Sequence, residues 1–185
     1  MADRDESDVS DTVAHWPFDA GAGSTAEEVV SGRRDAVEHA FDDARFQPGS
    51  DPRWIDGVDG HALLFDGYST EITHEGRLLD GETAALTIEA WIAPRAFEGR
   101  ASECLSALIS NHSIDDARGF EFGLDGHGRC SLQVGLGDSW KSVRADDPLP
   151  RYDWSHVAAV FDGDDGVLAL YVDGERTASQ HVPSE

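Results

Sequence analysis

Carboxylates are the commonest side chains in this chain that could do chemistry, and a pair of them could hydrolyse a glycosidic bond. A glycosidase needs two carboxylates facing a sugar, and many β-sandwich glucanases carry them as Glu-x-Asp-x-x-Glu along one strand. The nearest match, residues 6–11, lies in an acidic tail and ends in Asp11 instead of glutamate. Glu89 and Glu121 are isolated carboxylates on expected strands. The sequence therefore predicts no catalytic residue, and an independent glycosidase is the least favoured function.

Aromatic side chains close to planar polar ones favour binding instead. Sugars present apolar CH faces that stack on aromatic rings, and their hydroxyls hydrogen-bond to polar side chains. We expect Trp91 or Trp140 to be the stacking ring, and Glu89, Gln133 and Asn111 to bind hydroxyls. The alternative is that these tryptophans pack inside the fold, which is the commoner fate of the residue.

The segment "WSHVAAVFDGDDGVLALYVDGE", residues 154–175, could be a metal loop or a hairpin. Asp162 and Asp164 have the i, i+2 spacing of an EF-hand loop. However, Gly166 stands at the third ligand position, Val167 stands where that loop needs glycine, and no glutamate closes it. Alternating apolar residues on both sides of Asp-Asp-Gly predict a β-hairpin.

The charge balance limits the partners. The 185 residues include 37 acidic and 14 basic ones, a formal charge of −23, and Lys141 is the single lysine. A nucleic acid or an acidic membrane surface would be repelled by this charge. Clustered calcium sites or adaptation to molar salt could explain it. Because the acidic residues are spread along the whole chain, we favour salt adaptation, in which salt screens their repulsion.

Other features suggest an intracellular domain. No run of 18 apolar residues is present, and residues 1–12 are too acidic for a signal peptide, so we expect a flexible tail followed by one domain over residues 13–185. The location would then be the cytoplasm of a salt-adapted microbe, if the N-terminus is native. Cys104 and Cys130 have no metal-ligand spacing. We expect two free thiols, with a single disulfide as the alternative.

Short alternating segments joined by Gly and Asp turns indicate an all-β fold. Strands are expected at 86–94, 106–113, 120–124, 132–136, 139–145, 154–161 and 167–172, with two more around Asp66-Gly67. Residues 19–40 are expected to be a polar loop with a weak helical pattern near its end. This pattern predicts an antiparallel β-sandwich.

Several motifs resemble those of laminin-G-like domains, which have the concanavalin A-like jelly-roll fold. They are "HWPFDAGAGSTAEEVVSG", "GHALLFDGYST", "LTIEAWIAP" and the segment 154–175, and together they span residues 13–182. The resemblance implies a jelly-roll sandwich. Laminin-G-like domains usually continue beyond the Tyr-Val-Asp-Gly-Glu strand, whereas this sequence ends at "HVPSE". We therefore expect a sandwich that lacks its last strands.

A narrower resemblance suggests a function. Residues 43–70 and 119–143 are similar to the laminin-G-like domain that precedes the catalytic propeller of some family-32 glycoside hydrolases, the levanase and invertase group. This implies a non-catalytic domain that binds fructan or a related glycan, with a catalytic domain adjoining it in a longer parent chain. The alternative is a structural or protein-interaction domain. Many laminin-G-like domains hold a structural calcium, and the resemblance assigns Asp19 and Asp35 as its ligands here.

Overall fold

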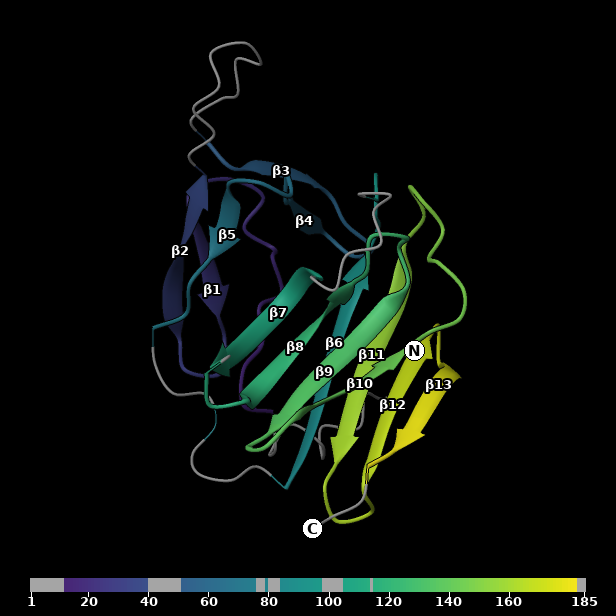
Figure 1. Cartoon of the computed structure of the whole chain (residues 1–185). Coiled ribbons are helices and arrows are strands. Elements are labelled where there is room, and N and C mark those ends of the chain that lie inside the picture. The colour runs from purple at the N-terminus through teal and green to yellow at the C-terminus, as the bar shows by residue number, and fades with distance from the viewer. Residues whose placement is uncertain are drawn as a thin grey trace, which may run out of the picture. The chain divides into compact units, whose positions relative to one another are not determined.

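The structure is a computed structural model that describes residues 12–39, 51–75, 79, 84–97, 105–113 and 115–182. Within these residues every regular element is a β-strand and every pairing is antiparallel (Figure 1). The predicted all-β antiparallel class is therefore confirmed. The chain divides into two compact units, Met1–Gly81 and Glu82–Glu185, each of which is described by itself. The described residues include no helix long and apolar enough to cross a membrane.

The N-terminal unit has one three-stranded sheet and one separate hairpin. Its sheet has the strand order β1-β2-β5, and β3 pairs with β4. A small apolar core of Ala26, Val37 and Leu63 is joined by partly buried aromatic side chains, including Trp54. The strands are β1 Thr25–Glu28, β2 Arg33–His39, β3 Arg53–Asp56, β4 His61–Leu64 and β5 Thr70–Ile72.

Strands β1 and β2 correct the sequence analysis. The sequence analysis expected a loop with a weak helical pattern over residues 19–40, but within this range residues 25–28 and 33–39 are strands that pair as a hairpin. Burial alternates along it, with Ala26 and Glu28 buried on β1 and Asp35 and Val37 buried on β2. Two of these four buried residues are acidic, so the alternation is hidden when only apolar residues are counted. Strands β4 and β5 do flank Asp66-Gly67, as predicted, but pair with β3 and β2.

The C-terminal unit is a sandwich of two four-stranded sheets (Figure 1). We call the sheet with order β10-β9-β8-β7 the front sheet, and the sheet with order β13-β12-β11-β6 the rear sheet. The front strands are β7 Ser106–Ser113, β8 Arg118–Leu124, β9 Cys130–Leu136 and β10 Trp140–Arg144. The rear strands are β6 Ala85–Ile92, β11 Ser155–Asp162, β12 Val167–Val172 and β13 Glu175–His181.

The two sheets pack face to face through apolar side chains. Strands β9 and β10 contact β12, and the inward residues include Phe122 and Leu132 from the front sheet and Leu168 and Leu170 from the rear sheet. Each of these four residues is at most 1% exposed. Because side chains alternate along a strand, the residues between these positions lie on the outer faces. Each sheet therefore has one face in the core and one outer face.

The expected strands of this unit are confirmed, and one strand was not expected. Strand β13 follows the Asp-Gly turn and pairs with β12 at the edge of the rear sheet. Only Ala178 of its seven residues is even half-buried. A strand that is exposed on both faces needs no apolar alternation, so its sequence carried no strand signal.

Carboxylates fix two of the hairpin turns of the sandwich. Asp125 is buried, and its Oδ1 accepts the backbone N–H groups of His127 and Arg129, while its Oδ2 accepts the Arg129 guanidinium. Burial raises the pKa of Asp125, but the hydrogen bonds from Arg129 and His127 outweigh it and hold the pKa below its usual range. Asp162 similarly accepts the N–H groups of Asp164 and Asp165, as expected of a hairpin turn.

Candidate functional site

The outer face of the front sheet holds an aromatic row. His112 on β7 pairs with Gly119, Gly119 pairs with Gly135, and Gly135 pairs with Trp140 on β10. Three strand spacings separate the outer strands by about 14 Å. The rings of His112 and Trp140 nevertheless approach to 5.9 Å between centroids, edge to face. They meet above β8 and β9 because neither glycine has a side chain to separate them. We call these four residues the aromatic row.

The two glycines of the aromatic row are required by the backbone. Gly119 has φ +97°, and a Cβ there would lie 2.0 Å from the carbonyl oxygen of Asn111. At Gly135 a Cβ would lie 2.3 Å from the carbonyl oxygen of Ala117. Both distances are far below van der Waals contact, so any larger residue would displace a neighbouring strand. Because glycine is needed at both positions, no side chain covers this part of the outer face.

A polar row lies beside the aromatic row. Ser110 pairs with Glu121, Glu121 with Gln133, and Gln133 with Ser142. Each residue is two positions from a member of the aromatic row, so both rows share one face and lie about 7 Å apart along the strands. Ser110 and Ser142 are exposed, and Glu121 and Gln133 are half-buried. The face thus combines a half-buried indole with hydroxyl, amide and carboxylate groups.

The structure brings together two of the five residues predicted to bind a ligand. Trp140 and Gln133 lie on this outer face, in neighbouring rows. Asn111 pairs with Phe120, whose side chain is 7% exposed in the core, so Asn111 shares the inward face instead. Its neighbour His112 occupies the outer face. Glu121, which the sequence suggested only as an isolated carboxylate, stands next to Gln133.

Trp91 and Glu89 lie on the outer face of the rear sheet. Trp91 is 52% exposed and pairs with His156 on β11, and their ring centroids are 5.2 Å apart. The His156 Nε2 atom is 3.5 Å from Glu89 Oε2, and the His156 backbone N–H donates to Asp173 Oδ1. We call Trp91, Glu89 and His156 the rear cluster.

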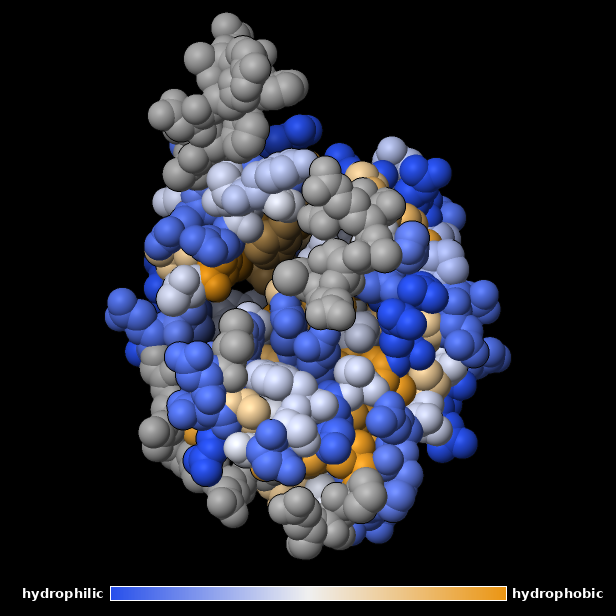
Figure 2. All heavy atoms as spheres, in the orientation of Figure 1, coloured by the Kyte–Doolittle hydropathy of each residue, from blue (hydrophilic) through white to orange (hydrophobic). Residues whose placement is uncertain are grey.

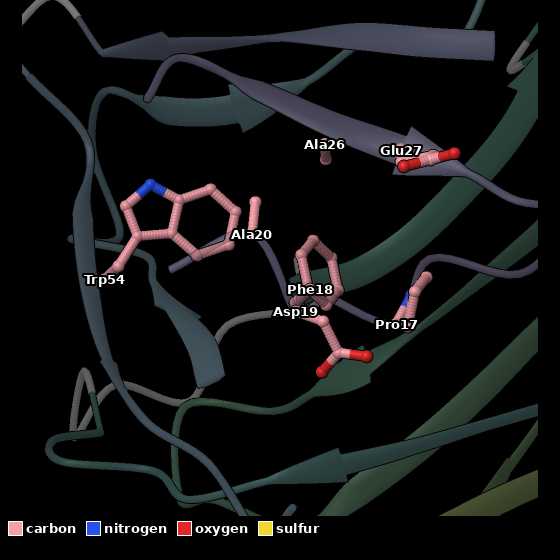
Figure 3. Close-up of a pocket in the computed structure, with 7 residues that line it drawn as sticks. All are labelled: Pro17, Phe18, Asp19, Ala20, Ala26, Glu27 and Trp54. Atoms are coloured by element: carbon pink, nitrogen blue, oxygen red, sulfur yellow. The ribbon is translucent and has the colours of Figure 1, made fainter. Parts of the chain in front are cut away.

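A pocket of about 220 Å³ lies in the N-terminal unit (Figure 3). The rings of Trp54 and Phe18 line it together with small apolar side chains, and Asp19 and Glu27 line its edge. Both rings also pack against the apolar core of this unit. The Trp54 indole N–H donates to the carbonyl of Gly23, which fixes the ring. The pocket is thus a gap beside the core with aromatic walls.

The predicted calcium ligands do not converge on a metal site in the described part of the chain. Asp35 is 4% exposed, and its Oδ2 lies 2.8 Å from both the Trp16 indole nitrogen and His74 Nδ1. Burial raises the Asp35 pKa, but the hydrogen bonds from His74 and Trp16 lower it overall. Among the described residues no three His, Cys, Asp or Glu side chains are grouped to hold a metal. Calcium prefers six to eight oxygens, more than these two carboxylates supply. The assignment of Asp19 and Asp35 stays a prediction.

Thiol chemistry is suppressed at Cys130. Its side chain is buried, and burial together with the nearby Asp125 charge raises the pKa of its thiol to about 12. The thiolate, which is the reactive form, is therefore scarce at neutral pH. Cys104 lies outside the described residues, so the pairing of the two cysteines stays a prediction.

The match to known families covers most of the chain. Residues 66–185, well over half of the sequence, match the Laminin_G_3 model, described as the concanavalin A-like lectin/glucanases superfamily. The chain belongs to this family. The matched range contains every strand of both sandwich sheets of this laminin-G-like protein. Family membership agrees with the jelly-roll class predicted from the sequence.

Solved structures resemble this laminin-G-like chain at low identity. Domain 4 of AbnA, a GH43 extracellular arabinanase from Geobacillus stearothermophilus solved with arabinotriose, is 21% identical with a TM-score of 0.54. That alignment covers 91% of this chain and 74% of the other. An S-layer domain-containing protein from Clostridium thermocellum gives 12% identity and a TM-score of 0.45, over 93% and 73% of the two chains. No curated protein matches significantly.

Proposed function

We propose that this chain is a non-catalytic carbohydrate-binding domain and that its sugar site is the outer face of the front sheet. The observation that carries the proposal is the pairing of two rows on one face. The aromatic row supplies the indole of Trp140, which is in T-shaped contact with the ring of His112. The polar row supplies Glu121 and Gln133 about 7 Å away. A sugar needs this combination of a stacking surface and hydroxyl partners.

Recognition fits this face better than hydrolysis. Glycoside hydrolysis uses two carboxyl groups on opposite sides of the scissile bond. Along the aromatic and polar rows of the front sheet, Glu121 is the one residue with a carboxylate. An open face buries little of its ligand, so we expect weak affinity. Such a domain acts by raising the local substrate concentration for a tethered enzyme.

The comparisons support a carbohydrate-related role. The family is described by its lectins and glucanases. The domain of AbnA with the similar fold belongs to an arabinanase, and its structure contains arabinotriose. For this chain we infer an accessory role beside a catalytic domain of a glycoside hydrolase.

The finer proposal concerns the parent enzyme and its environment. The resemblance of residues 43–70 and 119–143 favours a fructan- or sucrose-directed family-32 hydrolase as the adjoining catalytic part. The formal charge of −23 favours a salt-adapted microbe and, with the acidic N-terminus, its cytoplasm. Levan, inulin and sucrose are accordingly the first ligands to examine, with arabinotriose as the competing class.

Calorimetric titration in molar KCl tests the site. Wild type, Trp140→Ala and Trp140→Phe would be titrated with levan, inulin, sucrose, fructose and arabinotriose. We expect saturable heat in wild type, a loss of affinity of about tenfold or more in Trp140→Ala, and partial retention in Trp140→Phe. Tyr68→Ala is the matched control, because Tyr68 is an exposed aromatic residue (88%) of the other unit.

Two results would contradict the proposal. If no sugar gives heat with a folded sample, the structural or protein-interaction role becomes the better explanation of this laminin-G-like fold. If binding is unchanged in Trp140→Ala, the sugar site is elsewhere on the chain.

A further inference from the structure

We infer that the rear cluster is a second sugar-contacting site, so that one domain bridges two glycan segments. This inference rests on the proposed function and adds a second, independent ligand contact to it. The rear cluster combines an aromatic ring, an imidazole and a carboxylate on adjacent strands of the rear sheet. These groups are of the same chemical kinds as those on the front face.

The side chain of Trp91 is open to solvent. Its side chain is 52% exposed, although burying a tryptophan would remove a large apolar area from water. Along β6 the neighbouring positions Ala90 and Ile92 are half-buried, because they point toward the core. The indole is held from one side by the ring of His156, at 5.2 Å between centroids. The two ring planes are tilted by 59°, and an indole that keeps about half of its surface in solvent can stack on the apolar face of a sugar.

The polar neighbours of Trp91 lie within reach of each other. The ring of His156 is next to the Trp91 ring, and its Nε2 atom is 3.5 Å from Glu89 Oε2. Its backbone is tied to Asp173 by two hydrogen bonds, N–H to Oδ1 at 2.9 Å and carbonyl to the Asp173 N–H at 2.8 Å. Imidazole and carboxylate together offer both a donor and acceptors for hydroxyl groups.

A small side chain in the middle of this face projects little from the sheet. Ala158 on β11 pairs with Glu89 on one side and with Tyr171 on the other. The three residues form a row next to the pair of Trp91 and His156, two positions along each strand. Small residues therefore occupy the middle of both outer faces: glycines in the aromatic row of the front sheet and Ala158 in the rear sheet.

The two sites cannot serve a single sugar. The core residues Phe122 and Leu170 lie between the sheets, so the outer faces point in opposite directions (Figure 1). Packed sheets are about 10 Å apart, and each outer face lies beyond its own backbone. In the same orientation, Figure 2 shows a mostly hydrophilic surface over the described residues. Trp140 and Trp91 would thus contact separate segments of glycan.

Stoichiometry tests the inference directly. Wild type, Trp91→Ala, Trp140→Ala and the double variant would be titrated calorimetrically with arabinotriose and with 1-kestose in molar KCl. We expect two equivalents in wild type, one in each single variant and none in the double variant. Trp91→Phe should restore the second equivalent, and circular dichroism would confirm that each variant is folded.

Cross-linking gives a second readout. Wild type mixed with polymeric inulin or arabinan should raise turbidity, because one domain joins two chains. Each single variant should still sediment with the polymer but lose the turbidity. Tyr68→Ala controls for adhesion through any exposed ring.

The outcomes separate this inference from the proposed function. A single equivalent that is abolished by Trp140→Ala and unchanged by Trp91→Ala would overturn the second site and leave the first. A single equivalent abolished by either substitution would also overturn it, because it would mean one shared site. Absence of binding to every sugar would overturn both proposals.

Discussion

Apolar side chains fill the interior of the C-terminal unit, whereas buried carboxylates recur in the N-terminal unit. In the sandwich, Phe122, Leu132 and Leu170 are among the fully buried residues. In the N-terminal unit the buried apolar residues are small or few, and Glu28 is 0% exposed. The comparison indicates that hydrophobic burial holds the sandwich that carries both proposed sites, whereas hydrogen bonds to ionised groups contribute more to the other unit.

Glu28 and Asp66 show how carboxylates organise the N-terminal unit. Glu28 accepts the backbone N–H groups of His15, Val30 and Ser31, and also the Ser31 hydroxyl. Burial raises the Glu28 pKa, but these hydrogen bonds outweigh it and lower the pKa to about 2. Asp66 accepts the Ser69 hydroxyl and three backbone N–H groups after β4. Burial raises its pKa, but these hydrogen bonds outweigh it and hold the pKa far below the usual range. Both carboxylates stabilise turns only while they are ionised.

The largest expected effect is the loss of stability caused by a cavity in the sandwich. Leu170→Ala should lower the free energy of unfolding by about 3 kcal/mol or more, because Leu170 is 0% exposed between the sheets. Leu108→Ala is the matched control, since Leu108 is 39% exposed on β7, and it should cost less than about 1 kcal/mol. Urea unfolding in molar KCl measures both. Equal losses would contradict the idea that apolar burial between the sheets stabilises this unit.

A smaller loss is expected at the buried carboxylate of the other unit. Glu28→Gln should cost about 2 kcal/mol, because an amide can accept fewer of the surrounding N–H groups. Its neighbour Glu27 is exposed, so Glu27→Gln should change stability little. Hydrogen exchange should show faster exchange at the amides of Val30 and Ser31 in Glu28→Gln alone. Unchanged protection there would remove the structural role of Glu28.

Acid should affect the N-terminal unit first. The pKa of Glu28 is about 2 in the folded chain and about 4.5 when unfolded, so the unfolded state binds an extra proton between these values. Stability is therefore complete above pH 4.5 and falls as the pH drops toward 2, by up to about 1.4 kcal/mol per pH unit for each such carboxylate. Asp35 and Asp66 of the same unit shift in the same direction, as does Asp125 of the sandwich. As the pH is lowered toward 4, hydrogen exchange should become faster at amides of the N-terminal unit before it does at amides of the sandwich.

Salt should act on both units together. A formal charge of −23 destabilises a compact state by self-repulsion, and molar KCl screens it. We expect the melting temperature to rise by several degrees, equivalent to about 1 kcal/mol, between dilute buffer and molar KCl. An unchanged melting temperature would count against salt adaptation.

The smallest expected effect is that of calcium. In the structure Asp35 Oδ2 is engaged by Trp16 and His74, so a metal would have to displace these contacts. We expect millimolar calcium to shift the melting temperature by less than about 1 °C. A larger shift that EDTA reverses and Asp35→Asn abolishes would establish the calcium site. It would also show that a bound metal stabilises the N-terminal unit.

Local patterns were enough to predict most of the sandwich. Residues 86–94 alternate strongly, and the Asp125 and Asp162 turns lie within a few residues of the strands that they join. Such signals depend on near neighbours and survive in the sequence. The hairpin of β1 and β2 was missed because Glu28 and Asp35 occupy its inward positions. Only the hydrogen-bond donors around them make that burial possible.

The candidate binding residues came from the sequence, while their grouping came from the structure. The sequence alone determined the antiparallel class and the principal hairpins, and it selected Trp91, Trp140 and Gln133 as candidates for a sugar site. Tertiary structure decided that Trp91 and Trp140 lie on different sheets, because sheet order joins β6 to β11 across some 60 residues. It also decided the face of Asn111, because the irregular register near Ala107 sets which β7 residues point outward. Strand order and register follow from long-range packing, which no local pattern in the sequence contains.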